Sequence, residues 1–158
     1  MAGNRLIVSG DTIYAQAIAA QTHAVFNPNA DQCLARVEDG KLFGGVIYQG
    51  YTGVGGSVQM HMAGFVPNWA NRDMLWIAFD YPFNQLKCGV VFGQVSETNT
   101  KALDIDLKLG FKMVAKIDGV FPDGACYVMR LARDECRWLN LKPRSVKSAS
   151  EITDGRQS

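Results

Sequence analysis

The segment Ser96 to Phe111, SETNTKALDIDLKLGF, combines polar side chains with a helix pattern that could build a ligand site. Asn99 comes at the start of apolar residues with helical spacing, where an amide side chain can meet a ligand held between two strands. Gly110 lets the chain leave the helix with a positive φ, and Phe111 then begins a strand inside the core. Packing of a helix end on a sheet also explains Leu-Gly-Phe by itself. Asn99 at this spacing favours a ligand-binding role for the segment over helix packing alone.

His61 is the side chain best suited to proton transfer at neutral pH. It alternates with Met60 and Met62 in the run Val58 to Val66, so it should point to the polar face of a strand. The ordinary pKa of histidine, about 6.5, suits a general base. A histidine satisfied by backbone or solvent fits the same pattern. His23, at the end of a predicted helix, is interpreted as a solvated C-terminal residue.

The first half of the chain alternates between strand and helix patterns. Arg5 to Gly10 is β-branched and predicts a strand, and a helical pattern follows for which Asp11 is the candidate N-cap. Asp39-Gly40, between two β-prone runs, predicts a hairpin that precedes the strand carrying His61. The next helix has Asp73 in its first turn, where the helix dipole favours a carboxylate.

The second half continues the alternation. Pro82 should bend or end the preceding helix. Cys88 to Val95 is nearly all apolar, which predicts a central strand covered on both faces. Ser96 is the expected N-cap of the next helix. Two further strands are joined by the turn Pro122-Asp123-Gly124.

This order predicts an α/β fold in which helices flank a central mixed sheet. Two strand–helix–strand successions in the second half imply two parallel crossovers. At 158 residues, with 47% hydrophobic and 20% charged residues, one domain is expected. We assign that domain to residues 1–139. Residues 140–158 are polar without apolar periodicity and predict a flexible tail.

Composition gives no support for several classes of partner. The net charge is +1, from 16 basic and 15 acidic side chains, so the whole-chain field does not attract nucleic acid or an anionic membrane. No apolar run approaches the roughly 20 residues of a membrane span, and a cytoplasmic location is expected. The four cysteines form no C-x-x-C pair and are interpreted as buried thiols, with no metal site.

The helix and the turn that follows it resemble the N-x-x-A…L-G-F signature of the GNAT N-acetyltransferase superfamily. The predicted element order from Arg5 to about Leu131 is also similar to that fold. The resemblance implies a GNAT-like acyl-CoA N-acyltransferase fold, acetyl-CoA or another acyl-CoA as cofactor, and an amine as acceptor. The matching positions are Asn99, Ala102, Ile105, Leu109, Gly110 and Phe111.

The resemblance also implies where acetyl-CoA would lie. GNAT proteins hold it in a V-shaped gap between two parallel strands, here the strand of His61 and the strand Cys88 to Val95. Its pantetheine arm would pair with the first strand, and its pyrophosphate would rest on amides at the start of the next helix. The side chains of Asn99 and Ala102 would contact the arm. The implied pantetheine residues are Met62, Ala63, Gly64, Phe65 and Val66, and the implied pyrophosphate residues are Asn71, Arg72, Asp73 and Met74.

The family's chemistry implies a base and an acid for proton transfer. A base often sits on the fourth strand, and His61 takes that position. The usual acid is a tyrosine one turn before Leu-Gly-Phe, where this chain has Asp106. An ordinary aspartate is ionised at pH 7, so Asp106 would need a pKa raised by about three units, and a solvated helix carboxylate is the simpler interpretation. Tyr127, Tyr81 or water could serve instead.

The start of the helix after the His61 strand departs from the family pattern. The diagnostic positions of the phosphate loop fall on Ala70, Asp73 and Leu75, and none matches. Asp73 would repel a phosphate by about 1 kcal/mol if it faced one in water. Arg72 could offset this repulsion. Separately, Tyr48, Tyr51 and Trp69 are candidates to shape an acceptor pocket, although core or rim packing explains each equally well.

Two alternatives to amine acetylation remain open. The stretches FDYPFNQL and ECRWL resemble a divergent branch of GNAT proteins encoded by bacteriophages, distantly similar to the phage Mu Mom protein. That resemblance implies modification of adenine in DNA, and only then a nucleic-acid partner. The altered phosphate loop and the missing tyrosine instead favour a binding module that has lost catalysis. A homodimer is expected from the resemblance alone.

Overall fold

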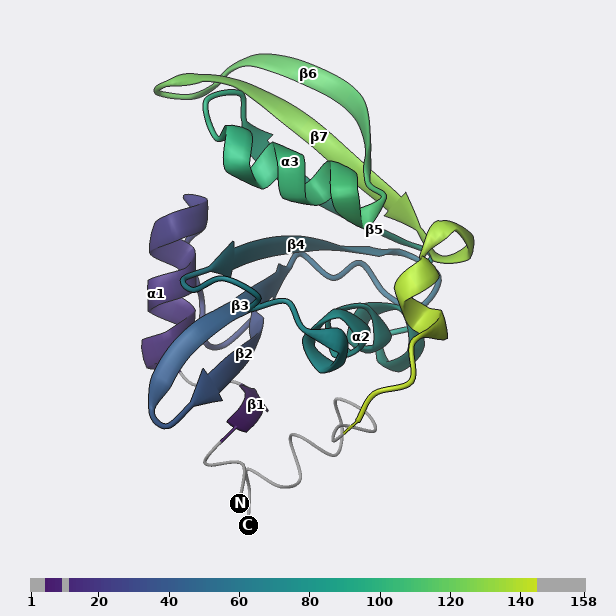
Figure 1. Ribbon diagram of the computed structural model, residues 1–158. Helices are drawn as coiled ribbons and strands as arrows, with labels where there is room; N and C mark the ends of the chain where they lie inside the picture. Colours follow the sequence, from purple (N-terminus) through teal and green to yellow (C-terminus); the bar gives the residue numbers. More distant parts are fainter. Residues whose placement is uncertain (1–4, 10–11, 145–158) are drawn as a thin grey trace.

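The computed structural model describes residues 5–9 and 12–144, which form one seven-stranded sheet with α1 on one face and α2 and α3 on the other (Figure 1). Its helices are α1 (Thr12–Thr22), α2 (Arg72–Asp80) and α3 (Thr100–Leu109). Its strands are β1 (Arg5–Ser9), β2 (Gln32–Glu38), β3 (Lys41–Gln49), β4 (Ser57–Gly64), β5 (Val90–Ser96), β6 (Lys112–Phe121) and β7 (Gly124–Ala132).

The strand order is β1-β2-β3-β4-β5-β7-β6. β4 and β5 are parallel, and the other neighbouring pairs are antiparallel. The crossover through α2 therefore joins adjacent parallel strands. The crossover through α3 leads to β6, which is parallel to β5 but lies one place away, because β7 inserts between them. The predicted mixed sheet is confirmed.

Turn chemistry places the β2–β3 hairpin where the sequence predicts it. Asp39 and Gly40 both have positive φ, 53° and 78°, as a tight two-residue hairpin turn requires. The candidate N-cap Asp11 lies outside the described residues.

Pro82 ends α2 as expected. α2 stops at Asp80, and Tyr81–Gln85 continues as a π-helical turn with Pro82 at its start. Proline cannot donate the next helical hydrogen bond, so the ladder changes its spacing there. Asn71 is the N-cap of α2, because its side-chain oxygen accepts from the backbone N–H of Met74 at 2.9 Å, and Asp73 lies in the first turn as predicted.

Two predictions about β5 and α3 are wrong. Ser96 is the last residue of β5 rather than an N-cap, and Asn99 caps α3 instead. β5 is central but is not covered on both faces, because Gln94 is exposed and Phe92 is only half-buried. Gly110 does end α3 in the left-handed conformation, with φ 102°, and Phe111 is buried beyond it.

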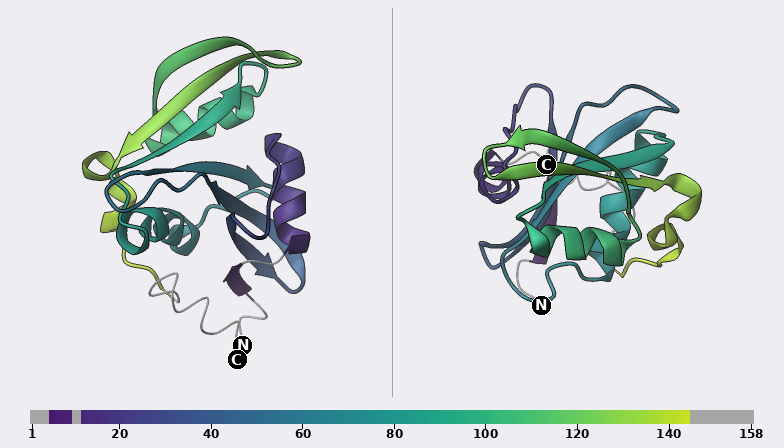
Figure 2. Two further views of the ribbon diagram at one scale, coloured as in Figure 1. Left: turned by 180° about the vertical axis from the view of Figure 1, so that it is seen from behind. Right: turned by 90° about the horizontal axis from the view of Figure 1, so that it is seen from above.

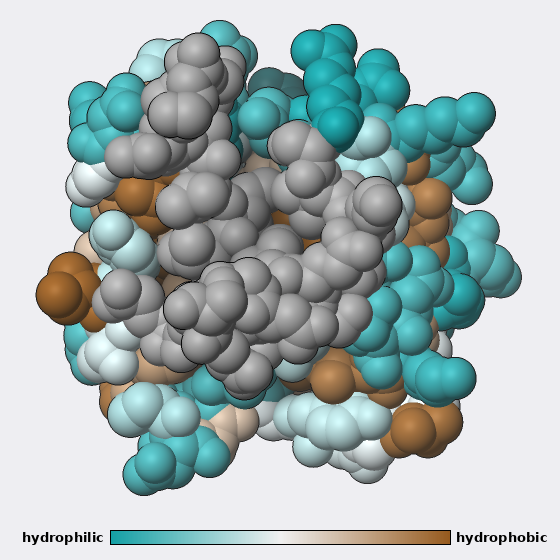
Figure 3. Space-filling view, turned by 90° about the horizontal axis from the view of Figure 1, so that it is seen from below, coloured by the Kyte–Doolittle hydropathy of each residue, from teal (hydrophilic) through white to brown (hydrophobic). Residues whose placement is uncertain are grey.

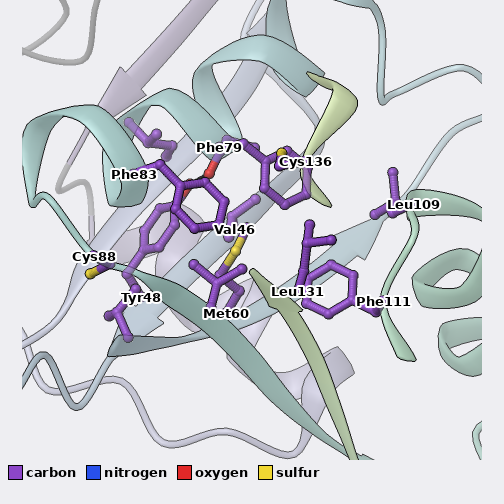
Figure 4. Close-up of a cluster of buried hydrophobic side chains, with 14 of the residues drawn as sticks. Val46, Tyr48, Met60, Phe79, Phe83, Cys88, Leu109, Phe111, Leu131 and Cys136 are labelled. Carbon is purple, nitrogen blue, oxygen red and sulfur yellow. Dashed lines mark hydrogen bonds between the residues drawn. The ribbon is translucent and has the colours of Figure 1, made fainter. Parts of the chain in front are cut away.

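The buried side chains form two clusters, one on each face of the sheet. The smaller joins α1 to β2 and β3 through residues such as Ile18, Val37 and Ile47. The larger joins α2 and the end of α3, with Phe111 just beyond it, to the sheet, and part of it is shown in Figure 4. All four cysteines are buried, as expected, and Cys88 and Cys136 belong to the larger cluster.

After β7 the chain turns back along α2. Its 3-10 turn Arg137–Asn140 packs on the larger cluster through Trp138 and Leu139. The Trp138 indole N–H donates to the Leu109 carbonyl at 2.8 Å. The predicted tail begins at 140, but residues 141–144 continue along α2, and residues 145–158 lie outside the described part.

The surface seen from below mixes hydrophilic residues with separate hydrophobic patches (Figure 3). Among the residues that the structure describes, no helix has both the length and the apolar character that a membrane span requires.

Candidate functional site

The site begins where β4 and β5 separate. Their pairing covers only Ser57↔Val90, Val58↔Val91 and Gln59↔Phe92. Beyond this point β4 keeps its bonds to β3, and β5 keeps its bonds to β7. Among the described residues, the β5 side of β4 therefore has no strand partner from Met60 to Gly64, and the two halves of the molecule diverge (Figure 1). The separation predicted by the family resemblance is present.

Gly93 lies at the point of divergence. A side-chain carbon at this position would come within 3.1 Å of the Met60 carbonyl oxygen. This contact is tighter than side chains normally make, so glycine allows the two strands to approach closely just before they part.

A pocket lies in the opening between the strands. It draws residues from the end of α1, from both diverging strands and from α3. The lining residues are Thr22, His23, Met60, His61, Met62, Gln94, Val95, Ser96, Asn99, Ala102 and Asp106.

Two further pockets extend this opening along β4 as one groove. The first shares Met62, Asn99 and Ala102 with it and also touches Ala63 and Gly64. The second is almost entirely apolar and reaches Trp69, Met74 and Leu109. The groove therefore leads from His61 to the beginning of α2.

His61 faces the smaller core cluster side of β4 and reaches the pocket. Its Nε2 atom is buried and has no hydrogen-bond partner among the described residues. Burial lowers the pKa of His61 below 6.5, and the nearby Asp31 carboxylate opposes this only partly. At pH 7 the ring is therefore neutral and can accept a proton.

Asp106 is buried, and the interpretation as a solvated carboxylate is wrong. Only 8% of the residue is exposed, although it lies on a helix near the surface. Burial raises the pKa of the Asp106 carboxyl from 3.8 to about 7. The shift has the size that a proton donor at neutral pH would need, and the side chain lines the same pocket as His61.

Asn99 has both a structural and a site position. Its side-chain oxygen accepts from the Ala102 N–H at 3.2 Å, so it caps α3. The residue also lines the first two pockets of the groove. Since the oxygen is used in the cap, the side-chain NH₂ is the group left to meet a ligand.

The beginning of α2 is already occupied by groups of the chain itself. The Asn71 oxygen caps Met74, as described above. Asp73 is buried, and its Oδ1 accepts from the Arg144 N–H at 2.5 Å. Arg72 is exposed and donates to the Lys142 carbonyl at 3.5 Å. The last described residues thus cross the helix end to which the resemblance assigns a pyrophosphate.

The loop between β4 and α2 is held from the opposite side by Arg36. Its Nη1 donates to the carbonyls of Asn68 and Trp69, at 2.7 and 2.8 Å. The Trp69 ring packs on the backbone of Gly44 and Gly64, where a side-chain carbon would come within 2.4 and 2.0 Å of it. Trp69 is one of the three aromatic residues predicted to shape an acceptor pocket. It is half-buried and lines the apolar end of the groove.

The other two predicted acceptor residues lie away from the opening. Tyr48 is only 2% exposed, and its hydroxyl donates to the Ala78 carbonyl at 2.6 Å, so it is a core residue and the acceptor prediction is wrong. Tyr51 donates to the Leu86 carbonyl at 2.8 Å, near the end of the sheet where β4 and β5 are still paired.

The alternative proton donors are also outside the pocket lining. Tyr127 pairs with Val95 across β5 and β7 and packs on the larger cluster. Tyr81 contacts the Tyr48 ring edge-on at 4.9 Å, and burial raises its pKa above 10.

Of the predicted pantetheine residues, Phe65 and Val66 lie beyond the end of β4. The Phe65 N–H donates to the Phe43 carbonyl.

Sequence reasoning missed Gln94, Ser96, Thr22 and the site position of His23. His23 is exposed, as expected, but it lines the pocket. Gln94 and Ser96 reach the opening only because β5 leaves β4. Nothing in a local sequence pattern reports that event. No group of three or more possible metal ligands occurs within residues 5–9 and 12–144.

Comparison with solved structures confirms the predicted fold. Spermidine N-acetyltransferase from Vibrio cholerae, in complex with CoA and spermine, superposes with a TM-score of 0.58 at 17% identity, covering 80% of this chain and 76% of that one. A dodecameric structure of that enzyme in an intermediate state gives 0.56 at 18% identity, covering 67% of each chain. At these identities the likeness concerns the fold, which is that of the GNAT acetyltransferases. No protein-family model and no curated sequence matches the chain.

Proposed function

We propose that this protein is a CoA-dependent N-acyltransferase that moves an acyl group, most simply acetyl, from acyl-CoA to an amine. One observation carries the proposal: β4 leaves β5 after Gln59 and borders a groove in which His61, Asn99 and Asp106 come together. A buried acid with a raised pKa and a buried neutral histidine in one pocket are typical of proton-transfer sites.

The groove fits the extended arm of an acyl-CoA. Met62, Ala63 and Gly64 present backbone groups without a strand partner on the β5 side, and such groups can pair with an extended ligand. The apolar pocket that follows suits the methylene and methyl groups of the arm. Phosphate binding is supported less well, because Asp73 lies at the beginning of α2. Arg72 is an exposed cation there.

When bound, acyl-CoA supplies an acyl group activated as a thioester. The neutral His61 ring can take a proton from an ammonium acceptor and leave a nucleophilic amine. Asp106 holds its proton up to about pH 7 and can give it to the departing thiolate sulfur, and the proton that the acylated nitrogen loses can restore the acid form of Asp106. The NH₂ group of Asn99 can donate a hydrogen bond that orients the arm.

The proposal is tested by titrating acetyl-CoA in a calorimeter and by thermal shift. A ligand at 100 times its dissociation constant should stabilise the protein by about 2.7 kcal/mol. Ala102→Phe fills the groove from α3 and should abolish binding, whereas Leu107→Phe, at an exposed position of the same helix, should leave it unchanged. No heat of binding and no thermal shift at millimolar acetyl-CoA would favour a binding module that has lost catalysis. The contacts of Lys142 and Arg144 with the beginning of α2 support that alternative.

The acceptor is the second part of the test. Spermidine and spermine are the first amines to assay, since the similar structures are of spermidine N-acetyltransferases. Mass analysis of nucleosides from DNA of cells that express the protein covers the nucleobase alternative. Acetylated polyamine together with unchanged nucleosides would support an amine acceptor. A modified adenine would instead support the nucleobase alternative.

A further inference from the structure

The turn between β6 and β7 is hydrogen-bonded to the loop that leads from β5 into α3. The Asp123 carboxylate accepts from the Ser96 hydroxyl at 3.0 Å through Oδ1 and from the Thr98 hydroxyl at 2.7 Å through Oδ2. The hydrogen bond from Thr98 has the larger effect and that from Ser96 the smaller, and both lower the pKa of the Asp123 carboxyl. The residue is exposed, yet both of its carboxylate oxygens are engaged.

A second set of bonds holds the same two segments together. The Glu97 N–H donates to the Ala125 carbonyl at 2.9 Å, and the Ala125 N–H donates to Glu97 Oε2 at 2.7 Å. A side-chain carbon on Gly124 would come within 2.7 Å of Glu97 Cγ. The absence of a side chain at Gly124 therefore lets the turn approach this closely.

The loop that Asp123 holds ends at Asn99. The Ser96 hydroxyl accepts from the Thr98 N–H at 3.3 Å, and the Ser96 carbonyl accepts from the Asn99 N–H at 2.9 Å. Ser96 and Asn99 both line the pocket. A continuous path of hydrogen bonds thus runs from Asp123, outside the pocket, to the residue that caps α3 and faces the groove.

The turn also reaches the other half of the molecule. Phe121 lies beside His23 at the end of α1, with ring centroids 6.2 Å apart. His23 further lowers the pKa of Asp123. In both side views the turn lies above the C-terminal end of α1 (Figures 1 and 2). It therefore connects the diverging halves of the sheet at the α1 end of the opening.

We propose that Asp123 is a positioning residue, which fixes the loop Ser96 to Asn99 and thereby places Asn99 in the groove. Asp123 contacts no ligand in this role. Its effect is transmitted through Ser96 and Thr98. The ligand-binding part of this inference rests on the proposed function, whereas the effect on the loop does not.

The test compares Asp123→Ala with Asp118→Ala, an exposed aspartate on the same hairpin whose side chain makes no hydrogen bond or ion pair with the described residues. Amide hydrogen exchange is measured for residues 96–102 and for the β2–β3 hairpin as an internal reference. Asp123→Ala should speed exchange in residues 96–102 about tenfold, the equivalent of losing one or two hydrogen bonds, and leave the reference unchanged. Asp118→Ala should match the wild type. Exchange that is unchanged in residues 96–102, or raised equally everywhere, would overturn the inference.

Two further measurements separate positioning from general stability. Asp123→Asn should restore most of the protection, because an amide can accept from one hydroxyl and donate to the other. Acetyl-CoA affinity should fall about tenfold in Asp123→Ala and by much less in Asp123→Asn. If the wild type binds no acetyl-CoA, the proposed function fails, but the exchange data still decide the role of Asp123.

Discussion

Replacing Asp106 with asparagine should stabilise the protein at alkaline pH and do little at acidic pH. The carboxyl has a pKa of 3.8 in its ordinary state and about 7 in the fold, because burial disfavours the ionised form. Folded protein therefore keeps this proton while the unfolded chain has already lost it. The free energy of unfolding falls as pH rises from about 4 to 7 and levels off above, as far as this group is concerned.

The magnitude follows from the difference between the two pKa values. A pKa change from 3.8 to about 7, at about 1.4 kcal/mol per pH unit, corresponds to about 4 kcal/mol of destabilisation at pH 8. At pH 4 the same group contributes less than about 1 kcal/mol. Asparagine has nearly the same shape and does not titrate, so the gain from Asp106→Asn should grow with pH by about 3 to 4 kcal/mol.

Urea denaturation of both proteins at pH 4, 6 and 8 measures this dependence. Other groups titrate in both proteins, so their contributions largely cancel in the difference. Asp104→Asn is the matched control, since Asp104 lies on the same helix in an exposed i,i+4 pair with Lys108 and should change stability by less than about 0.5 kcal/mol at every pH. A gain from Asp106→Asn that is the same at all three pH values would refute burial as the cause of the raised pKa.

Two further predictions concern the walls of the groove. Gly64→Ala should displace the Trp69 ring, lower stability by about 1 to 3 kcal/mol and shift tryptophan emission, whereas Gly89→Ala, where the nearest atom would be at 3.4 Å, should do neither. The His61 ring should titrate in NMR spectra with a midpoint below 6.5; because its pKa is lowered in the fold, this residue's contribution to stability should be lost as pH falls below 6.5, and His61→Gln should reduce that loss. A midpoint at or above 6.5 would contradict its burial.

Local chemistry explains what the sequence could predict. The positive φ values of Asp39, Gly40 and Gly110 and the burial of Phe111 follow from turn and cap preferences within a few residues. Local preferences predict Ser96 as the N-cap of α3 although Asn99 takes that position, because both are good N-cap residues and nothing local shows that β5 extends through Ser96. Choosing between them requires knowing how far the strand stays paired with β7.

Long-range contacts explain what the sequence could not predict. Asp106 has the surroundings of an ordinary helix carboxylate in the sequence, and its burial arises because the opposite wall of the groove, on β4 and β5, lies across from α3. Tyr48 is a core residue because Ala78, thirty residues away, accepts its hydroxyl bond. The separation of β4 from β5 after Gln59 has no sequence pattern of its own, because the alternation of apolar and polar residues continues through His61 and Met62 and ends only at Ala63.

The half-paired state of β4 has a consequence for the solubility of the protein. A strand with free N–H and C=O groups ordinarily invites pairing with strands of other molecules, and so promotes aggregation. Here the free stretch from Met60 to Gly64 is inside the molecule, with Asn99 and Ala102 of α3 facing it. A slender extended molecule can enter such a slot, but a twisted strand carrying side chains on both faces meets α3 first. The fold thus leaves these backbone groups free to bind a narrow ligand while α3 blocks strands of other protein molecules from pairing with them.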